Sequence, residues 1–122
     1  MEKDIIDLHK RWIATEIADR EGIIEFCSND FEFSPTSELK IKGKLNFLNW
    51  LRESNDGSKI ESIKISNRQV IYLNQLGTLK ANFETTFRTM DDQKQTIYGQ
   101  HMWQLYFENK SWKVVKLTWK IE

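Results

Sequence analysis

Three stretches of alternating apolar and polar residues at the C-terminal end constrain the fold more than any other feature. They read LKANFETTF over residues 79–87, TIYGQHMWQLYF over 96–107 and WKVVKLTWKI over 112–121. A period of two is typical of β-strands with one buried face, because successive side chains point to opposite sides of a sheet. The polar breaks at 90–93 and 108–111 suit hairpin turns. We therefore expect an antiparallel meander.

The N-terminal half has the periodicity of helices instead. Apolar residues spaced by three and four predict a helix over residues 2–18, and its stripe consists of Ile5, Leu8, Trp12, Ile13 and Ile17. A short second helix is expected after Asp19, whose side chain suits an N-cap, with its end near residues 28–29. A third opens at Gly43 with an apolar face of Leu45, Phe47, Leu48, Trp50 and Leu51 and closes at the turn-rich segment 54–58.

Short strands are expected between and after these helices. Phe31 and Phe33 alternate with polar residues before Pro35, the only proline, and residues 38–42 are a plausible partner strand. The strand that starts near residue 60 changes its apolar parity, which predicts a bulge near Asn67 and Arg68. Helices followed by a meander indicate the α+β class, and 122 residues fit one domain over 1–122.

Composition excludes several classes of function. Eighteen basic and eighteen acidic residues are interspersed, so the basic footprint of a nucleic-acid-binding protein is missing. No apolar run approaches the ~20 residues that cross a bilayer, and the N-terminus lacks the apolar stretch of a signal peptide. With Cys27 as the single cysteine, we expect a cytoplasmic protein that does not enter membranes. Two histidines and isolated glycines offer no metal or phosphate motif, so neither metal nor cofactor is expected.

His101 stands out among the side chains that the alternation directs inward. That set is Leu79, Ala81, Phe83, Thr85, Phe87, Ile97, Gly99, His101, Trp103, Leu105, Phe107, Val115, Leu117, Trp119 and Ile121. An imidazole in an apolar row is either a hydrogen-bonded core group or a group that faces a ligand. Gly99, two positions earlier, leaves space that favours a cavity. Desolvation there would lower the pKa of His101 and keep it neutral near pH 7.

Large aromatic side chains supply candidate cavity walls, although they also make good core. Trp103 and Trp119 share the parity of His101, whereas Trp12 and Trp50 lie on the predicted helices. The candidate ligand-binding set is Trp12, Trp50, Phe83, Phe87, His101, Trp103, Leu117 and Trp119. The opposite parity places aromatic, aliphatic and Met side chains on the outer face of the sheet, which is typical of an interface. These residues are Tyr98, Met102, Tyr106, Trp112 and Val114.

The order of several short motifs resembles the nuclear transport factor two-like superfamily, and in particular its SnoaL-like branch. The motifs are a first helix with Trp12, the break ADREG, the strand FEF before Pro35, IKGK at the third helix, and the strands GQHMW and SWKVV, the last ending at Trp119. The resemblance covers essentially the whole chain. It implies the cystatin-like cone, in which a strongly curved, mainly antiparallel sheet wraps three N-terminal helices around a pocket. It also implies a homodimer through the outer sheet face.

The resemblance does not carry over a catalytic base. Ketosteroid isomerase relatives place a carboxylate just before the proline of the first strand, where this chain has Ser34. Glu16 or Asp19 could approach His101 only if the first helix turns that way. Three functions stay open: a homodimeric pocket domain for a small apolar or amphipathic molecule; a SnoaL-like isomerase, cyclase or dehydratase with His101 as general acid or base; and a non-catalytic dimerisation scaffold with a filled cone.

Overall fold

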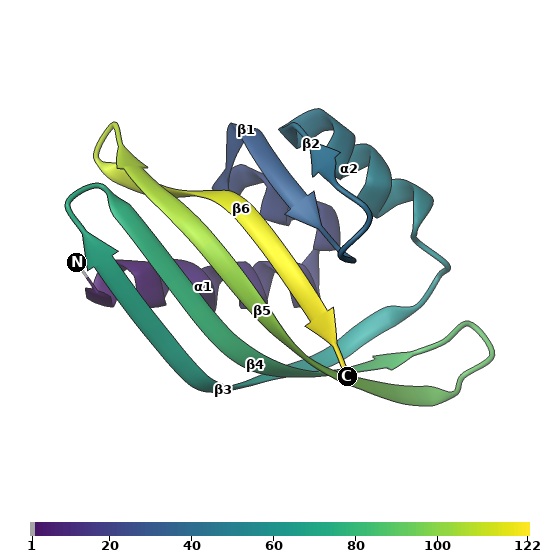
Figure 1. Cartoon of the computed structure of the whole chain (residues 1–122). Coiled ribbons are helices and arrows are strands. Elements are labelled where there is room, and N and C mark those ends of the chain that lie inside the picture. Colours follow the sequence, from purple (N-terminus) through teal and green to yellow (C-terminus); the bar gives the residue numbers. More distant parts are fainter. Residues whose placement is uncertain (1) are drawn as a thin grey trace.

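A single mixed β-sheet with helices along one face forms the molecule (Figure 1). The computed structural model describes residues 2–122. The elements are α1 Glu2–Ala18, the 3₁₀ helix η1 Arg20–Phe26, β1 Cys27–Ser34, β2 Ile41–Lys42, α2 Lys44–Glu53, β3 Lys59–Leu73, β4 Leu76–Arg88, β5 Lys94–Glu108 and β6 Ser111–Ile121. The strand order is β2-β1-β6-β5-β4-β3, and every neighbouring pair is antiparallel except β1 with β6. The predicted α+β class and meander are confirmed.

The first helix packs its apolar stripe against the sheet. Ile5, Leu8 and Trp12 are buried, as their spacing predicts, while Ile17 at the helix end is 38% exposed. In α2 the buried residues are Phe47 and Leu51, whereas Leu45 is 69% exposed and does not belong to the apolar face. The stripes that hold both helices on the core are therefore narrower than predicted.

The segment between the two α-helices differs from the prediction. The second helix is a 3₁₀ helix that ends at Phe26, and Asp19 occupies its N-cap position without a side-chain hydrogen bond. Cys27 already belongs to β1, because its backbone pairs with Val114 of β6. The expected strand over 38–42 shrinks to β2, whose two residues pair with the end of β1.

The predicted bulge in β3 is confirmed. The register against β4 shifts between Ser66 and Gln69, and Asn67 adopts a positive φ of 52°. A bulge inserts an unpaired residue, bends the strand and redirects the neighbouring side chain. Arg68 turns toward α1, where its Nε donates a hydrogen bond to His9.

A second bulge, in β6, was not predicted and overturns part of the inward set. Gln104 pairs with Lys116 while Leu105 pairs with Val114, so Val115 is the extra residue and the parity reverses at that point. Trp112 and Val114 are consequently buried in the core instead of lying on the outer face. Val115 is only half-buried and Ile121 is 50% exposed, so neither is a core residue.

Gly99 does not open a cavity as the sequence suggested, because the ring of Phe83 occupies its space. A Cβ at residue 99 would lie 2.6 Å from Phe83 Cζ and 2.7 Å from the Lys120 carbonyl oxygen. Phe83 and Gly99 are directly paired across β4 and β5. The glycine therefore allows the ring to lie over the neighbouring strand and stack on His101, with centroids 5.5 Å apart.

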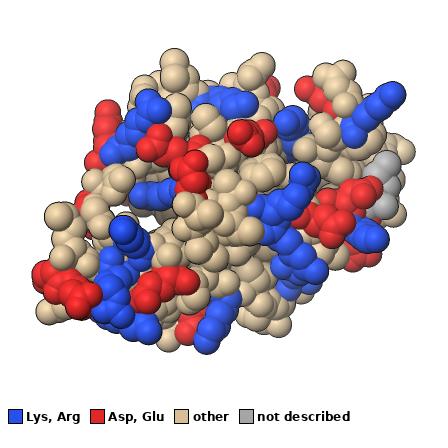
Figure 2. Space-filling view, turned by 180° about the vertical axis from the view of Figure 1, so that it is seen from behind, with Lys and Arg blue, Asp and Glu red and all other residues tan. Residues whose placement is uncertain are grey.

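Charged side chains are mixed over the surface. Figure 2 shows the face of the molecule opposite to the one seen in Figure 1. On it Lys and Arg are interspersed with Asp and Glu, and neither sign forms a continuous patch. Within residues 2–122, none of the helices combines the length and apolar character that crossing a bilayer requires.

Substituting Gly99 by Ala is expected to destabilise the protein by about 1–3 kcal/mol, because the added methyl group meets both a ring and a backbone oxygen. Urea denaturation of wild type, Gly99→Ala, Phe83→Leu and the double variant measures the effect. The double variant should lose less unfolding free energy than the two single variants lose together. The smaller side chain at residue 83 removes the contact of the new methyl group with the ring and leaves only its contact with the Lys120 carbonyl oxygen. Strict additivity would show that the ring does not depend on the glycine.

Candidate functional site

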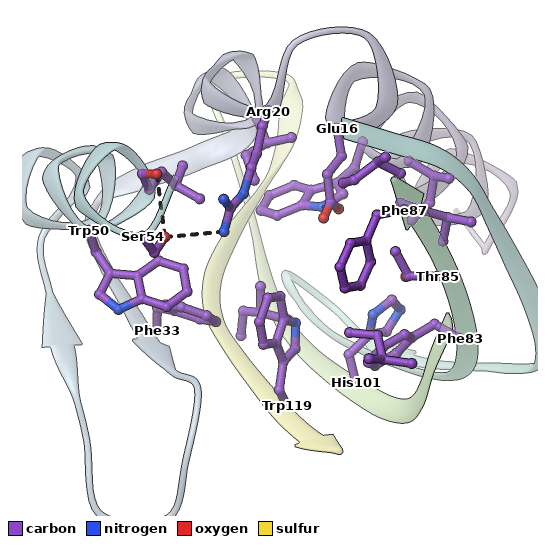
Figure 3. Close-up of a pocket in the computed structure, with 18 of the residues that line it drawn as sticks. Glu16, Arg20, Phe33, Trp50, Ser54, Phe83, Thr85, Phe87, His101 and Trp119 are labelled. Atoms are coloured by element: carbon purple, nitrogen blue, oxygen red, sulfur yellow. Dashed lines mark hydrogen bonds between the residues drawn. The ribbon is translucent and has the colours of Figure 1, made fainter. Parts of the chain in front are cut away.

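A cavity of about 240 Å³ lies between the helices and the concave face of the sheet (Figure 3). The eight residues that the sequence nominated for ligand binding all line it: Trp12, Trp50, Phe83, Phe87, His101, Trp103, Leu117 and Trp119. They come from α1, α2, β4, β5 and β6. The structure thus brings the nominated residues together, and their role in binding remains a prediction.

Aromatic rings form one side of the cavity. Phe33 lies 4.9 Å from Trp50 and 5.0 Å from Trp119 between ring centroids, in both cases edge to face. Trp119 in turn lies 6.4 Å from Phe83. These ring contacts pack the aromatic side chains against one another, so this side of the cavity is apolar.

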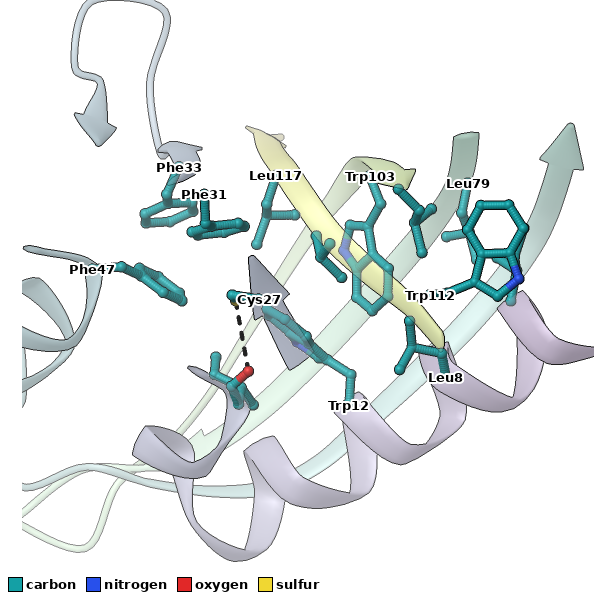
Figure 4. Close-up of a cluster of buried hydrophobic side chains, with 14 of the residues drawn as sticks. Leu8, Trp12, Cys27, Phe31, Phe33, Phe47, Leu79, Trp103, Trp112 and Leu117 are labelled. Atoms are coloured by element: carbon teal, nitrogen blue, oxygen red, sulfur yellow. Dashed lines mark hydrogen bonds between the residues drawn. The ribbon is translucent and has the colours of Figure 1, made fainter. Parts of the chain in front are cut away.

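The apolar back of the cavity is also the centre of the core (Figure 4). Trp103 is fully buried, and its ring lies 4.8 Å from that of Trp12 and 4.8 Å from that of His9. The Trp103 indole Nε1 has no hydrogen-bond partner in the described part of the chain. Trp103 therefore serves as both core and cavity lining, which the sequence treated as alternatives.

Glu16 is the acidic group that the sequence could not place. It lines the cavity from the last turns of α1 and accepts a hydrogen bond of 3.1 Å from Trp12 Nε1. Desolvation by burial raises the pKa of the Glu16 carboxyl above its ordinary value, although the bond from Trp12 and the charge of Arg20 oppose this. Glu16 follows Trp12 by four residues, so the helical spacing already put both on one face.

Arg20 adds a cation at the cavity rim. Its guanidinium lies 5.7 Å from the Trp50 ring centroid and donates a hydrogen bond of 3.3 Å to Ser54 Oγ (Figure 3). Stacking on an aromatic face and a hydroxyl acceptor both orient the cation. No sequence pattern signals this role, because Arg20 lies in η1 and Ser54 follows the end of α2, far along the chain.

His101 is buried and hydrogen-bonded, and it also lines the cavity. Its Nε2 lies 2.9 Å from Nε2 of His9 on α1. His9 is fully buried, and its Nδ1 accepts a bond of 3.0 Å from Arg68 Nε. The sequence left a core group and a ligand-facing group as alternatives; His101 is hydrogen-bonded in the core and lines the cavity as well, and its contact with a ligand stays a prediction. The prediction from sequence missed His9 and Arg68 as partners of His101, because they lie on α1 and β3.

Both histidines are neutral at physiological pH. Burial, assisted by the charge of Arg68, lowers the pKa of His101 to about 4. Burial, the neighbouring His101 and Arg68 lower the pKa of His9 to about 3. An uncharged imidazole is the form that can donate from one nitrogen and accept at the other.

Ser34, which stands where relatives of the ketosteroid isomerase type carry their base, takes no part in this cavity. It is buried at the end of β1, and its hydroxyl has no hydrogen-bond partner within residues 2–122. Among the groups that do line the cavity are the Glu16 carboxyl and the His101 imidazole, which Figure 3 shows directed inward from different walls.

No protein-family model matches the sequence, and no curated protein matches it. Solved structures do share its fold. An NTF2-like protein from Cytophaga hutchinsonii matches with a TM-score of 0.79 at 13% identity, over 97% of this chain and 95% of that one. A candidate scytalone dehydratase from Novosphingobium aromaticivorans gives 0.85 at 12% identity, over 98% and 83%. An NTF2-like protein with a cystatin-like fold from the same species gives 0.78 at 14%, over 98% and 80%.

These likenesses establish the fold. The cone that the resemblance implied is confirmed as a fold, because two of these neighbours are described as NTF2-like and one of them as having a cystatin-like fold. Identities of this size say nothing about shared chemistry, because one fold hosts many functions.

Stability is expected to fall as the pH is lowered from 7.5 to 5. The folded state keeps His101 and His9 neutral down to about 4 and about 3, while the unfolded chain takes up protons near 6.5. In this window the unfolded state binds more protons, so each histidine removes roughly 1 kcal/mol of unfolding free energy per pH unit. Glu16 acts with the opposite sign, because its raised pKa favours the folded state as the pH falls.

Urea denaturation at several pH values measures this dependence. His101→Gln removes one of the two titrating rings and should show a shallower slope than wild type. An identical slope in both proteins would contradict the assignment.

Proposed function

We propose that this domain with the NTF2-like fold binds a small, mostly apolar molecule between its aromatic walls. The observation that carries the proposal is the cavity of about 240 Å³, whose apolar lining surrounds one neutral imidazole. Ligand pockets typically combine apolar and aromatic walls with a few polar groups that fix orientation. Here Trp50 and Trp119 supply walls and His101 supplies the polar contact.

The size of the cavity favours a compact ligand. Pockets for drug-sized molecules are commonly about 300–1,000 Å³, and this cavity lies just below that range. A planar molecule of one or two rings is a better match than one of steroid size. The open space also argues against the filled cone that a pure scaffold would have.

A second function, as a lyase or isomerase, is favoured by one specific observation. A carboxyl group with a raised pKa and a neutral imidazole line the same cavity. A carboxyl shifted toward neutral pH is suited to proton transfer, and a neutral imidazole can polarise a carbonyl group. Glu16 would move the proton and His101 would contact the oxygen. Isomerase, cyclase and dehydratase reactions on carbonyl compounds all use such a pair.

A homodimer through the outer sheet face remains part of the proposal, with a smaller residue set. Trp112 and Val114 are buried and drop out, whereas Tyr98 is 51% exposed and Met102 and Tyr106 are half-buried on β5. Aromatic and Met side chains on an open sheet face suit a protein partner.

Ligand binding is expected to depend on the aromatic wall. A thermal-shift screen of one- and two-ring aromatic compounds, some with a ketone group, should yield binders that raise the melting temperature. Trp119→Leu should weaken their affinity by about tenfold or more, because a large ring is lost from the wall. Tyr72→Leu is the matched control, since Tyr72 lies on β3 away from the cavity and is 45% exposed.

The same binders separate the two functions. Turnover that Glu16→Gln abolishes, while affinity persists, would favour the enzyme. Binding without turnover would favour the binding domain. A screen with no binder, or equal effects of the Trp119 and Tyr72 substitutions, would overturn the binding proposal.

The homodimer is expected to dissociate when charge is placed on its face. Sedimentation velocity should show a dimer for wild type and a monomer for the double variant Tyr98→Asp and Met102→Asp, because burying two carboxylates is costly. Met90→Asp is the control at a residue that is 80% exposed in the β4–β5 turn. A wild-type monomer at micromolar concentration would disprove the homodimer.

A further inference from the structure

We propose that Arg68 and His9 lock His101 in the tautomer with its proton on Nδ1, so that the cavity selects a ligand with a hydrogen-bond acceptor such as a ketone oxygen. The inference rests on the proposed binding function and names the chemical class that the site would accept. It also assigns positioning roles to two residues that lie behind the cavity wall.

The first step is the bond from Arg68 to His9. A guanidinium has N–H donors and no acceptor, so the atom that it meets must carry a free lone pair. That atom is His9 Nδ1, at 3.0 Å. A neutral His9 with a bare Nδ1 carries its proton on Nε2.

The tautomer of His9 determines that of His101. The two Nε2 atoms are 2.9 Å apart, so one must donate and the other must accept. Since His9 Nε2 bears the proton, His101 Nε2 accepts it and must be bare. The proton of a neutral His101 therefore resides on Nδ1. In a doubly protonated His101, Nε2 would also carry a hydrogen and would face the N–H of His9. The repulsion between the two N–H groups opposes the ionisation of His101.

The N–H at His101 Nδ1 is the donor that remains. Three of the four ring nitrogens are bonded to each other or to Arg68, and His101 Nδ1 has no partner in the described part of the chain. The ring itself cannot turn freely. Phe83 stacks on it with an interplanar angle of 22°, and Trp103 lies 6.0 Å away on the same strand. The lining of the cavity thus offers an N–H that only a ligand or water can satisfy.

Arg68 reaches His9 because of the bulge in β3. Residue 68 lies within the register shift that follows the positive φ of Asn67. The same bulge that bends the strand over α1 therefore also sets the tautomer on the far side of the cavity wall. The other charged groups of the cavity lining are Glu16, Arg20 and Asp56. Their hydrogen bonds go to Trp12, Ser54 and Ser58, so they leave the histidine pair undisturbed.

One chemical consequence separates this inference from a general-base role. Both nitrogens of His101 are committed, Nε2 as acceptor from His9 and Nδ1 as donor, so no lone pair is available to take a proton from a ligand. His101 can hold or polarise an acceptor oxygen. If the domain catalyses a reaction, the proton must move to or from Glu16.

The tautomer is tested directly by nitrogen-15 NMR of histidine-labelled protein at pH 7.5. The chain has only two histidines, so His101→Gln assigns both rings. We expect the Nδ1–H form for His101 and the Nε2–H form for His9, in correlations that link each ring nitrogen to its carbon-bound protons. Arg68→Met should convert both rings to mixtures, while the control Arg88→Met, on the surface of β4, should leave them unchanged. An Nε2–H form of His101 would overturn the inference.

Selectivity is tested with two probes of the same shape, indan-1-one, which carries a ketone, and indane, which has no polar group. Wild type should bind indan-1-one about three- to tenfold more tightly, as one hydrogen bond would give. Arg68→Met should reduce the preference toward unity, and Arg88→Met should keep it. Equal affinity for the two probes in wild type would overturn the selection of acceptors. Failure of both probes to bind would count against the proposed pocket function for compact ring ligands, while the NMR result would still decide the tautomer.

Discussion

A hydrogen-bonded chain from Arg68 through His9 to His101 allows polar groups to cross the core of this protein. Burying either imidazole without a partner would cost on the order of 1–3 kcal/mol, and burying it charged would cost more. Each bond in the chain satisfies one group and depends on the next. The helix α1, the strand β3 and the strand β5 are therefore joined in the interior by polar bonds as well as by apolar contact. The cavity lies against this junction, so the imidazole in its described lining is held by two residues, His9 and Arg68, that do not line the cavity.

Bulges in β3 and β6 place side chains of the strands in the interior. The bulge at Asn67 turns Arg68 toward α1, and the bulge at Val115 brings Trp112 and Val114 into the core. A regular sheet could not do both, because strict alternation would send these side chains to the outer face. Gly99 contributes the third adjustment, since its missing side chain leaves room for Phe83 to stack on His101. The breaks at Asn67 and Gly99 thus lie behind the cavity lining and hold His101 and Phe83 in place within it.

The sequence predicted most of the fold and about half of the site, and the difference has a physical cause. Periodicity located the helix with Trp12, the meander and the bulge near Arg68, because these depend on neighbours along the chain. The second bulge was not visible, since the WKVV segment is apolar at both parities and either could face inward. His9 and Arg68 were missed as partners of His101 because bonds between distant elements leave no local pattern. Glu16 was within reach, because its spacing from Trp12 already puts the two residues on one helical face.

The position of β6 in the sheet determines when the six-stranded sheet can be completed during folding. The last strand of the chain runs between β1 and β5, and it is the sole neighbour through which β1, with β2 at its side, joins the rest of the sheet. On a ribosome, β1 and β2 emerge long before β6, the strand that links them to β3, β4 and β5. The β1–β2 part and the β3–β5 part of the sheet are joined only when the eleven-residue strand β6 pairs with both. Loss of β6 would therefore divide the sheet instead of trimming its edge.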